Sequence, residues 1–151
     1  MPPPDVWGPP IWTLFHVLAE KIKEEYFNIT LPPLIGFIKK ICAFLPCPDC
    51  AQHASQFLAK LPPQEISTKE KFITTLYLFH NMVNVRKKKE LYNYSNIAKY
   101  KYIPIPIAFN NFIRVYNTKG NMKLLTESFR RQLIIKEFKT WLINNLKYFQ
   151  M

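Results

Sequence analysis

The chain has 151 residues, a length typical of one domain that buries its own core. A hydrophobic content of 48% with 15% aromatic residues excludes a disordered protein, and 3 glycines against 13 prolines favour helices separated by prolines. The formal net charge of +11 fits binding to nucleic acid, an anionic membrane or a phosphorylated cofactor, but a lysine-rich composition also follows from an AT-rich genome.

The first predicted helix covers residues 7–26. Trp12, Phe15 and His16 recur at helical spacing and form its apolar face, whereas Lys21 belongs to the predicted solvent side. Taken singly, each of these aromatic residues and the histidine would fit an ordinary core position.

Two more helices are predicted over 28–47 and 47–61. Thr30 is the expected N-cap of the first, and Pro46 ends it because the residue before a proline avoids helical geometry. The second begins at "CPDC", where Pro48 suits the first helical position and Cys47 is the expected N-cap.

A fourth helix is predicted over 67–90. Ser67 and Glu70 have the spacing of a capping box at its start. Its apolar stripe consists of Phe72, Leu76, Phe79 and Val83.

The remainder of the chain is predicted to be less regular at first. Ser95 is the expected cap of a short fifth helix, and Pro104 and Pro106 predict an extended link. Two further helices are expected over 108–117 and 124–149, separated by "TKGN". The prediction is therefore an all-α fold with a domain over 1–102 and a C-terminal helical extension over 103–151.

The stretch "FLPCPDCAQH" (44–53) carries the most distinctive chemistry. A cysteine at a helix N-terminus is stabilised as a thiolate, which is the nucleophile of disulfide exchange. Together with Cys42 the chain has three cysteines, an odd number that excludes a closed disulfide framework. Neither a signal peptide nor an apolar run of about 18 residues is found, so we expect a soluble intracellular protein in which CxxC is catalytic or metal-binding.

Other interpretations of the CxxC pair stay open at this point. A zinc site needs four ligands. The candidate ligands are Cys47, Cys50, His53 and His80, and the usual second CxxC or HxxxH pair is absent. A thioredoxin fold needs a βαβ unit, for which no strand is predicted. The pair could also be inert, and a basic helical binding module with zinc-bound or inert cysteines is the alternative function.

Three motifs occur in a fixed order: "WGPPIWTLFH" (7–16), "LPCPDCAQH" (45–53) and "FHNMVN" (79–84). Together they resemble the FAD-linked sulfhydryl oxidases of the Erv/ALR family over about residues 7–100. The short form is most similar to the small oxidases of large cytoplasmic DNA viruses.

The resemblance implies a four-helix bundle with a short fifth helix, which binds FAD between its helices and usually forms a homodimer. It implies that Cys50 lies beside the flavin and that Cys47 is the outer sulfur that meets the substrate. No metal is expected. The implied FAD-binding residues are Gly8, Trp12, His16, His80, Asn81, Val83, Asn84, Lys89 and Tyr92.

The implied reaction takes electrons from a dithiol protein, either thioredoxin-like or itself a CxxC protein, through Cys47–Cys50 and FAD to O2, giving H2O2. The implied location is the host cytoplasm, with the virion as a second site. We expect neither nucleic acid as the primary ligand nor a membrane span.

Several features depart from the family pattern or stay open. Pro9 and Lys21 replace residues common in the family, and the flexible shuttle CxxC is missing, so a separate dithiol partner must reduce the protein directly. The run 86–88 either lies near a pyrophosphate or is a solvated helix end. Cys42 is either a small buried hydrophobe or a resolving or intersubunit thiol, and a direct role for His53 is open.

Overall fold

The computed structural model describes residues 4–117 and 125–150, and the predicted break at 118–121 lies outside them. In this part of the chain, α-helices and short 3-10 helices make up the fold, and the only strand-like pairing is one bridge between Ile22 and Phe149. The all-α prediction is confirmed. The α-helices are α1 (Pro4–Lys21), α2 (Phe27–Ala43), α3 (Pro48–Ala59), α4 (Lys69–Arg86), α5 (Ile105–Tyr116) and α6 (Leu125–Asn144), and the 3-10 helices are η1 (Glu24–Tyr26), η2 (Pro63–Ile66), η3 (Tyr94–Tyr102) and η5 (Leu146–Tyr148).

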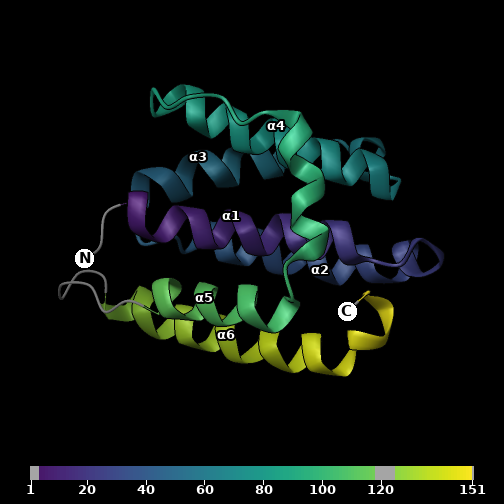
Figure 1. Ribbon diagram of the computed structural model, residues 1–151. Coiled ribbons are helices and arrows are strands. Elements are labelled where there is room, and N and C mark those ends of the chain that lie inside the picture. Colours follow the sequence, from purple (N-terminus) through teal and green to yellow (C-terminus); the bar gives the residue numbers. More distant parts are fainter. Residues whose placement is uncertain (1–3, 118–124, 151) are drawn as a thin grey trace.

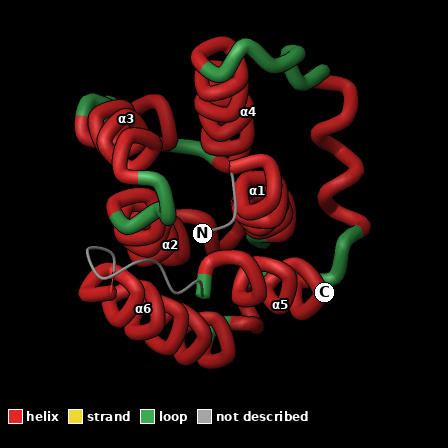
Figure 2. The backbone as a smooth tube through the Cα atoms, turned by 90° about the vertical axis from the view of Figure 1, so that its left-hand side faces the viewer, coloured by secondary structure: helices red, strands yellow, loops and turns green. Residues whose placement is uncertain are grey.

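The α-helices are stacked in three layers (Figure 1, Figure 2). Helices α3 and α4 form one outer layer, α1 and α2 the middle layer, and α5 and α6 the other outer layer. Helix α1 contacts α4, α5 and η3, while α2 contacts α3 and α6. The middle layer is therefore covered on both sides, and η3 crosses the edge of the stack beside α1.

The C-terminal helices share their core with the first four. The ring of Phe37 on α2 stacks on that of Phe138 on α6, with centroids 4.9 Å apart. Helix α5 buries apolar residues at helical spacing, among them Phe109 and Phe112. Burial of this apolar surface is the main force that holds the third layer in place.

The end of the first helix differs from the prediction. Helix α1 ends at Lys21, five residues earlier than expected, because the C-terminal strand-like segment pairs with the chain there: Gln150 N donates to Lys21 O (2.7 Å) and Lys23 N donates to Tyr148 O (2.9 Å). Lys21 itself is only 3% exposed although it was predicted on the solvent side.

Two predicted N-caps were wrong by a few residues. Helix α2 already begins at Phe27, so Thr30 lies inside it and its hydroxyl donates to Tyr26 O (2.7 Å). The N-cap of α4 is Thr68, whose Oγ1 accepts from Lys71 N (3.1 Å), because the hydroxyl of Ser67 donates to Gln64 O at the end of η2.

The segment after α4 also needed correction. Helix α4 ends at Arg86 rather than at 90, and Lys88 takes a positive φ of 57° that breaks the helix. The short fifth helix exists as η3, but Asn93 rather than Ser95 caps it. Pro106 lies inside the first turn of α5, where a missing N–H is tolerated, so the extended link is confined to the residues up to Pro104.

Candidate functional site

Cys47 and Cys50 form a disulfide at the N-terminus of α3. Cys47 is the N-cap, as predicted, and its sulfur accepts a hydrogen bond from Cys50 N (3.3 Å). Pro48 supplies the first helical residue, which needs no N–H donor, so the sequence itself places the disulfide at the positive end of the helix dipole.

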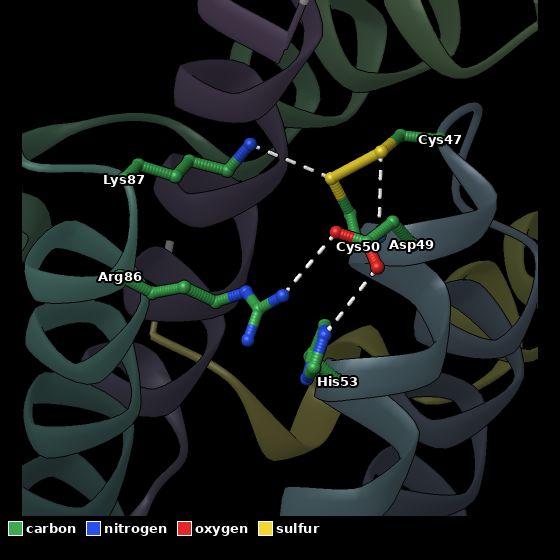
Figure 3. Close-up of a disulfide and its surroundings, with 6 residues drawn as sticks. All are labelled: Cys47, Asp49, Cys50, His53, Arg86 and Lys87. Carbon is green, nitrogen blue, oxygen red and sulfur yellow. Dashed lines mark hydrogen bonds and ion pairs between the residues drawn. A yellow bond between two sulfur atoms is a disulfide. The ribbon is translucent and has the colours of Figure 1, made fainter.

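Charged side chains from α3 and α4 surround this disulfide (Figure 3). The Lys87 ammonium lies 3.4 Å from Cys50 Sγ. One residue earlier on α4, Arg86 pairs with the carboxylate of Asp49 (3.2 Å), which His53 also approaches to 3.4 Å. These two cations at the C-terminal end of α4 thus contact separate partners: Lys87 contacts the sulfur, and Arg86 pairs with Asp49, the only carboxylate among the residues drawn in Figure 3.

A cavity of about 830 Å³ opens beside Cys50, within the size range of ligand pockets, which is about 300–1,000 Å³. It lies among α1, α3, α4 and η3, and Cys50 lines it whereas Cys47 does not. Of the predicted FAD-binding residues, those that line it are Gly8, Trp12, His80, Val83, Asn84, Lys89 and Tyr92.

Aromatic rings form one wall of the cavity. The rings of Trp12 and His80 are stacked with centroids 4.3 Å apart, and the ring of Tyr92 also stacks with that of His80, at 5.3 Å. His16 is only 1% exposed and is not among the lining residues; its Nε2 shares a hydrogen bond with His80 Nδ1 (3.0 Å). The structure therefore places His16 behind His80, where it orients that ring.

Burial keeps both histidines neutral. It lowers the pKa of His16 to about 3, with smaller contributions from His80 and Lys99. Burial, followed by the charge of Lys89, lowers the pKa of His80 to about 4. A neutral pair can share one proton in the observed hydrogen bond, with one ring donating and the other accepting.

Asn81 also lies outside the cavity lining and fixes the chain instead. Its amide donates to Tyr92 O (3.0 Å), and its Oδ1 accepts from Tyr92 N (2.6 Å) and from Asn84 Nδ2 (3.4 Å). These bonds hold the segment after α4 against the helix, which brings the Tyr92 ring to the cavity.

Sequence reasoning missed several residues of this site. Lys99 and Tyr100 line the cavity from η3, and the only signal for them is the alternation of basic and aromatic residues in that segment. Asp49 was not singled out, and the open alternatives for 86–88 did not include contact with sulfur. Cys42 is buried and borders the cavity, and desolvation raises its pKa to about 12.

A disulfide whose Cys50 lines a cavity with stacked aromatic rings is the arrangement expected of a dithiol redox protein that binds a flat cofactor. Within the described residues, no group of three or more histidine, cysteine or acidic side chains is arranged to hold a metal ion. None of the described helices is long and apolar enough to cross a membrane.

The sequence pattern of the Erv1/Alr family matches residues 9–103, and the chain therefore belongs to this family. The chain is 31% identical over 94 residues to protein 347L of Invertebrate iridescent virus 6, whose name contains the words FAD-linked sulfhydryl oxidase; the match covers 58% of this chain and 85% of that protein. It is 33% identical over 95 residues to the FAD-linked sulfhydryl oxidase of African swine fever virus (isolate Pig/Kenya/KEN-50/1950); the match covers 59% of this chain and 74% of that protein. No solved structure matches the chain significantly.

Proposed function

We propose that the protein is an FAD-linked sulfhydryl oxidase that forms disulfides in protein substrates. The observation that carries the proposal is that Cys50 of a helix-capping disulfide lines the same cavity as the stacked rings of Trp12, His80 and Tyr92. The family assignment and the names of the viral relatives point to the same activity. The alternative of a basic binding module is not favoured.

The residues around the cavity fit FAD, a ligand with flat rings and a pyrophosphate. Trp12 and Tyr92 offer aromatic faces for a ring system, and Lys89 and Lys99 offer cations for phosphate oxygens. Trp7 also lines the cavity, and its buried Nε1 has no hydrogen-bond partner in the described part of the chain. We propose that the motif residues lining the cavity bind FAD, while His16 and Asn81 position His80 and Tyr92.

The chain's own sulfurs carry out the first half of the reaction. A substrate thiolate attacks Cys47 Sγ, the Cys47–Cys50 bond breaks, and its electron pair passes to Cys50 Sγ. The second substrate thiolate then attacks the substrate sulfur of the mixed disulfide, which releases the oxidised substrate and the Cys47 thiolate. A bound FAD would supply the two-electron acceptor for the reduced pair and the route of these electrons to O2, with H2O2 as the product.

The proposal extends to partners and location. The substrate is a separate dithiol protein, either thioredoxin-like or a CxxC protein, acting in the host cytoplasm or the virion. We also propose a homodimer, in support of which Phe129 and Leu133 are exposed one turn apart on α6. Light scattering that gives twice the chain mass would support the dimer, and a single chain mass would contradict it.

The catalytic unit is proposed to be residues 1–102, with 103–151 as a helical extension. The cavity lining ends at Tyr100, and the family match ends at 103. Helices α5 and α6 lie on the side of the stack away from α3 and α4, so in this proposal they stabilise the catalytic unit without taking part in chemistry.

Oxygen consumption with a dithiol substrate tests the proposed function. The wild-type protein should consume O2 and release H2O2 in equal amounts, because each disulfide formed delivers two electrons. Cys47→Ser and Cys50→Ser should each abolish turnover, whereas Lys60→Met, a surface change at the far end of α3, should not. Turnover that survives either cysteine change would refute the assignment.

A further inference from the structure

Two effects compete for the negative charge that appears when the disulfide opens. The N-terminus of α3 favours a thiolate on Cys47, which sits at the N-cap and accepts the hydrogen bond from Cys50 N. The thiol with the more stable thiolate is the better leaving group. If only the helix dipole acted, the Cys47 thiolate would be the leaving group, and the substrate thiolate would attack Cys50, the cysteine that lines the cavity.

Lys87 reverses this balance at the other sulfur. Lys87 is half-buried, and its ammonium lies 3.4 Å from Cys50 Sγ; an opposite charge at such a distance stabilises a thiolate more than a helix end does. The nearest carboxylate, Asp49, opposes a thiolate but is itself paired with Arg86 and approached by His53. The other charged or titratable residues that line the cavity are Cys42, Asp49, His53, His80, Arg86, Lys89, Tyr92, Lys99 and Tyr100.

We propose that Lys87 is a catalytic residue of this oxidase, which stabilises the negative charge on Cys50 Sγ as the disulfide opens and so directs substrate attack to Cys47. This rests on the proposed function. In the step it assists, the bond from the substrate sulfur to Cys47 Sγ forms, the Cys47–Cys50 bond breaks, and the electron pair passes to Cys50 Sγ beside the ammonium. No proton is transferred, since Lys87 acts by its charge.

The thiolate on Cys50 can be measured directly in the reduced, full-length protein. A Cys47→Ser background leaves Cys50 as the reactive thiol, and its alkylation by iodoacetamide is followed across pH by mass spectrometry of the peptide that contains it. Lys87→Met should raise the pKa of Cys50 by about one unit. At a pH below the pKa of Cys50 in both proteins, Lys87→Met lowers the thiolate population about tenfold, while each thiolate becomes about threefold more nucleophilic. Alkylation in Lys87→Met should therefore be about threefold slower.

Matched variants separate the effect of the contact between Lys87 and Cys50 from the effect of losing one positive charge. Lys88→Met removes the same charge one residue away, on an exposed side chain, and should leave the pKa of Cys50 within a few tenths of a unit. Lys87→Arg keeps a cation and should restore most of the shift. The proposal is overturned if Lys87→Met changes the pKa no more than Lys88→Met does.

A second measurement tests the direction of attack. Oxidised protein is mixed with 2-mercaptoethanol, quenched with acid, and mapped for the cysteine that carries the adduct. Cys47 should carry it in the wild type, and the share on Cys50 should rise severalfold in Lys87→Met; an unchanged distribution would contradict the proposal. Both assays need neither FAD nor O2, so a colourless, inactive protein would refute the oxidase while these results still decide the role of Lys87.

Discussion

His16 and His80 are two histidines that burial holds in the neutral form at the site. Their rings share a hydrogen bond of 3.0 Å and lie among Trp12, Tyr92 and Tyr100. The sequence motifs predicted both histidines as direct FAD contacts, but the structure brings only His80 to the cavity. The helical spacing places His16 on the apolar face of the first helix, in agreement with its burial, whereas the direct contact with FAD was implied by the family resemblance alone.

The lowered pKa of His16 predicts a loss of stability in mild acid. In the unfolded chain its pKa is about 6.5 and in the fold about 3, so the unfolded state binds the proton first and stability falls as the pH drops below 6.5. Between pH 7 and pH 5 the fold should lose about 2 kcal/mol through His16. Urea unfolding of wild type and His16→Phe at both pH values checks this, with His53→Gln as control. An equal loss in wild type and His16→Phe would contradict it.

Cys42 is predicted to be chemically inert in the folded protein. Its thiol is buried, and desolvation raises its pKa to about 12, so almost no thiolate exists at neutral pH. Iodoacetamide should label Cys42 only after denaturant is added, as peptide mapping would show. Labelling of the native protein, or a disulfide to Cys42, would instead support the resolving or intersubunit role left open by the sequence.

At the scale of elements, the C-terminal helices hold the end of α2. Tyr116 of α5 donates from its hydroxyl to Ile41 O (3.0 Å), and the buried Arg131 of α6 donates to Phe44 O (3.2 Å). These carbonyls belong to the last turn of α2 and the residue after it, just before Cys47. The extension therefore fixes the chain that leads into the disulfide.

Loss of these bonds should destabilise the fold. Tyr116→Phe removes one buried hydrogen bond and should lower the free energy of unfolding by about 1 kcal/mol, and Arg131→Met removes a charged donor and should cost about 2 kcal/mol. Lys139→Met on the exposed side of α6 is the control, with an expected change near zero. Urea denaturation measures all three, and no loss in Arg131→Met would show that the contact carries no stability.

Element boundaries were the least predictable part of the fold. Helix type followed from apolar periodicity and proved correct, and the N-cap Cys47 was predictable because Pro48 follows it. The C-terminal ends of α1 and α4 could not be predicted. The end of α1 depends on pairing with the distant C-terminal segment, and the end of α4 depends on the positive φ at Lys88. Contacts between residues far apart in sequence leave no local signal.

For the whole molecule, the layered packing predicts that the catalytic unit needs its extension. Removal of 103–151 would expose apolar residues of α1 and α2, such as Phe37, that now pack against α5 and α6. We expect this fragment to aggregate or to lack a cooperative thermal transition, whereas the full chain melts cooperatively. A soluble fragment that still binds FAD would show that 1–102 folds independently.

The sequence predicted the all-α fold class of the whole molecule correctly, but it did not predict how the helices are layered. The three ordered motifs identified the family and most of the cavity, because Trp12, Cys50, His80 and Tyr92 fall in or near them. The third layer and the contact between Lys87 and Cys50 could not be predicted, because both depend on how α4 and α6 are placed against helices distant in sequence.

The visible absorbance spectrum, recorded before and after addition of dithiothreitol under air, tests the central claim most directly. The purified wild-type protein should be yellow, its flavin band should bleach as dithiothreitol reduces it, and the band should return once the dithiol is consumed by oxygen. Cys50→Ser should keep the band and lose the bleaching. A folded, colourless protein that binds no added FAD would contradict the account.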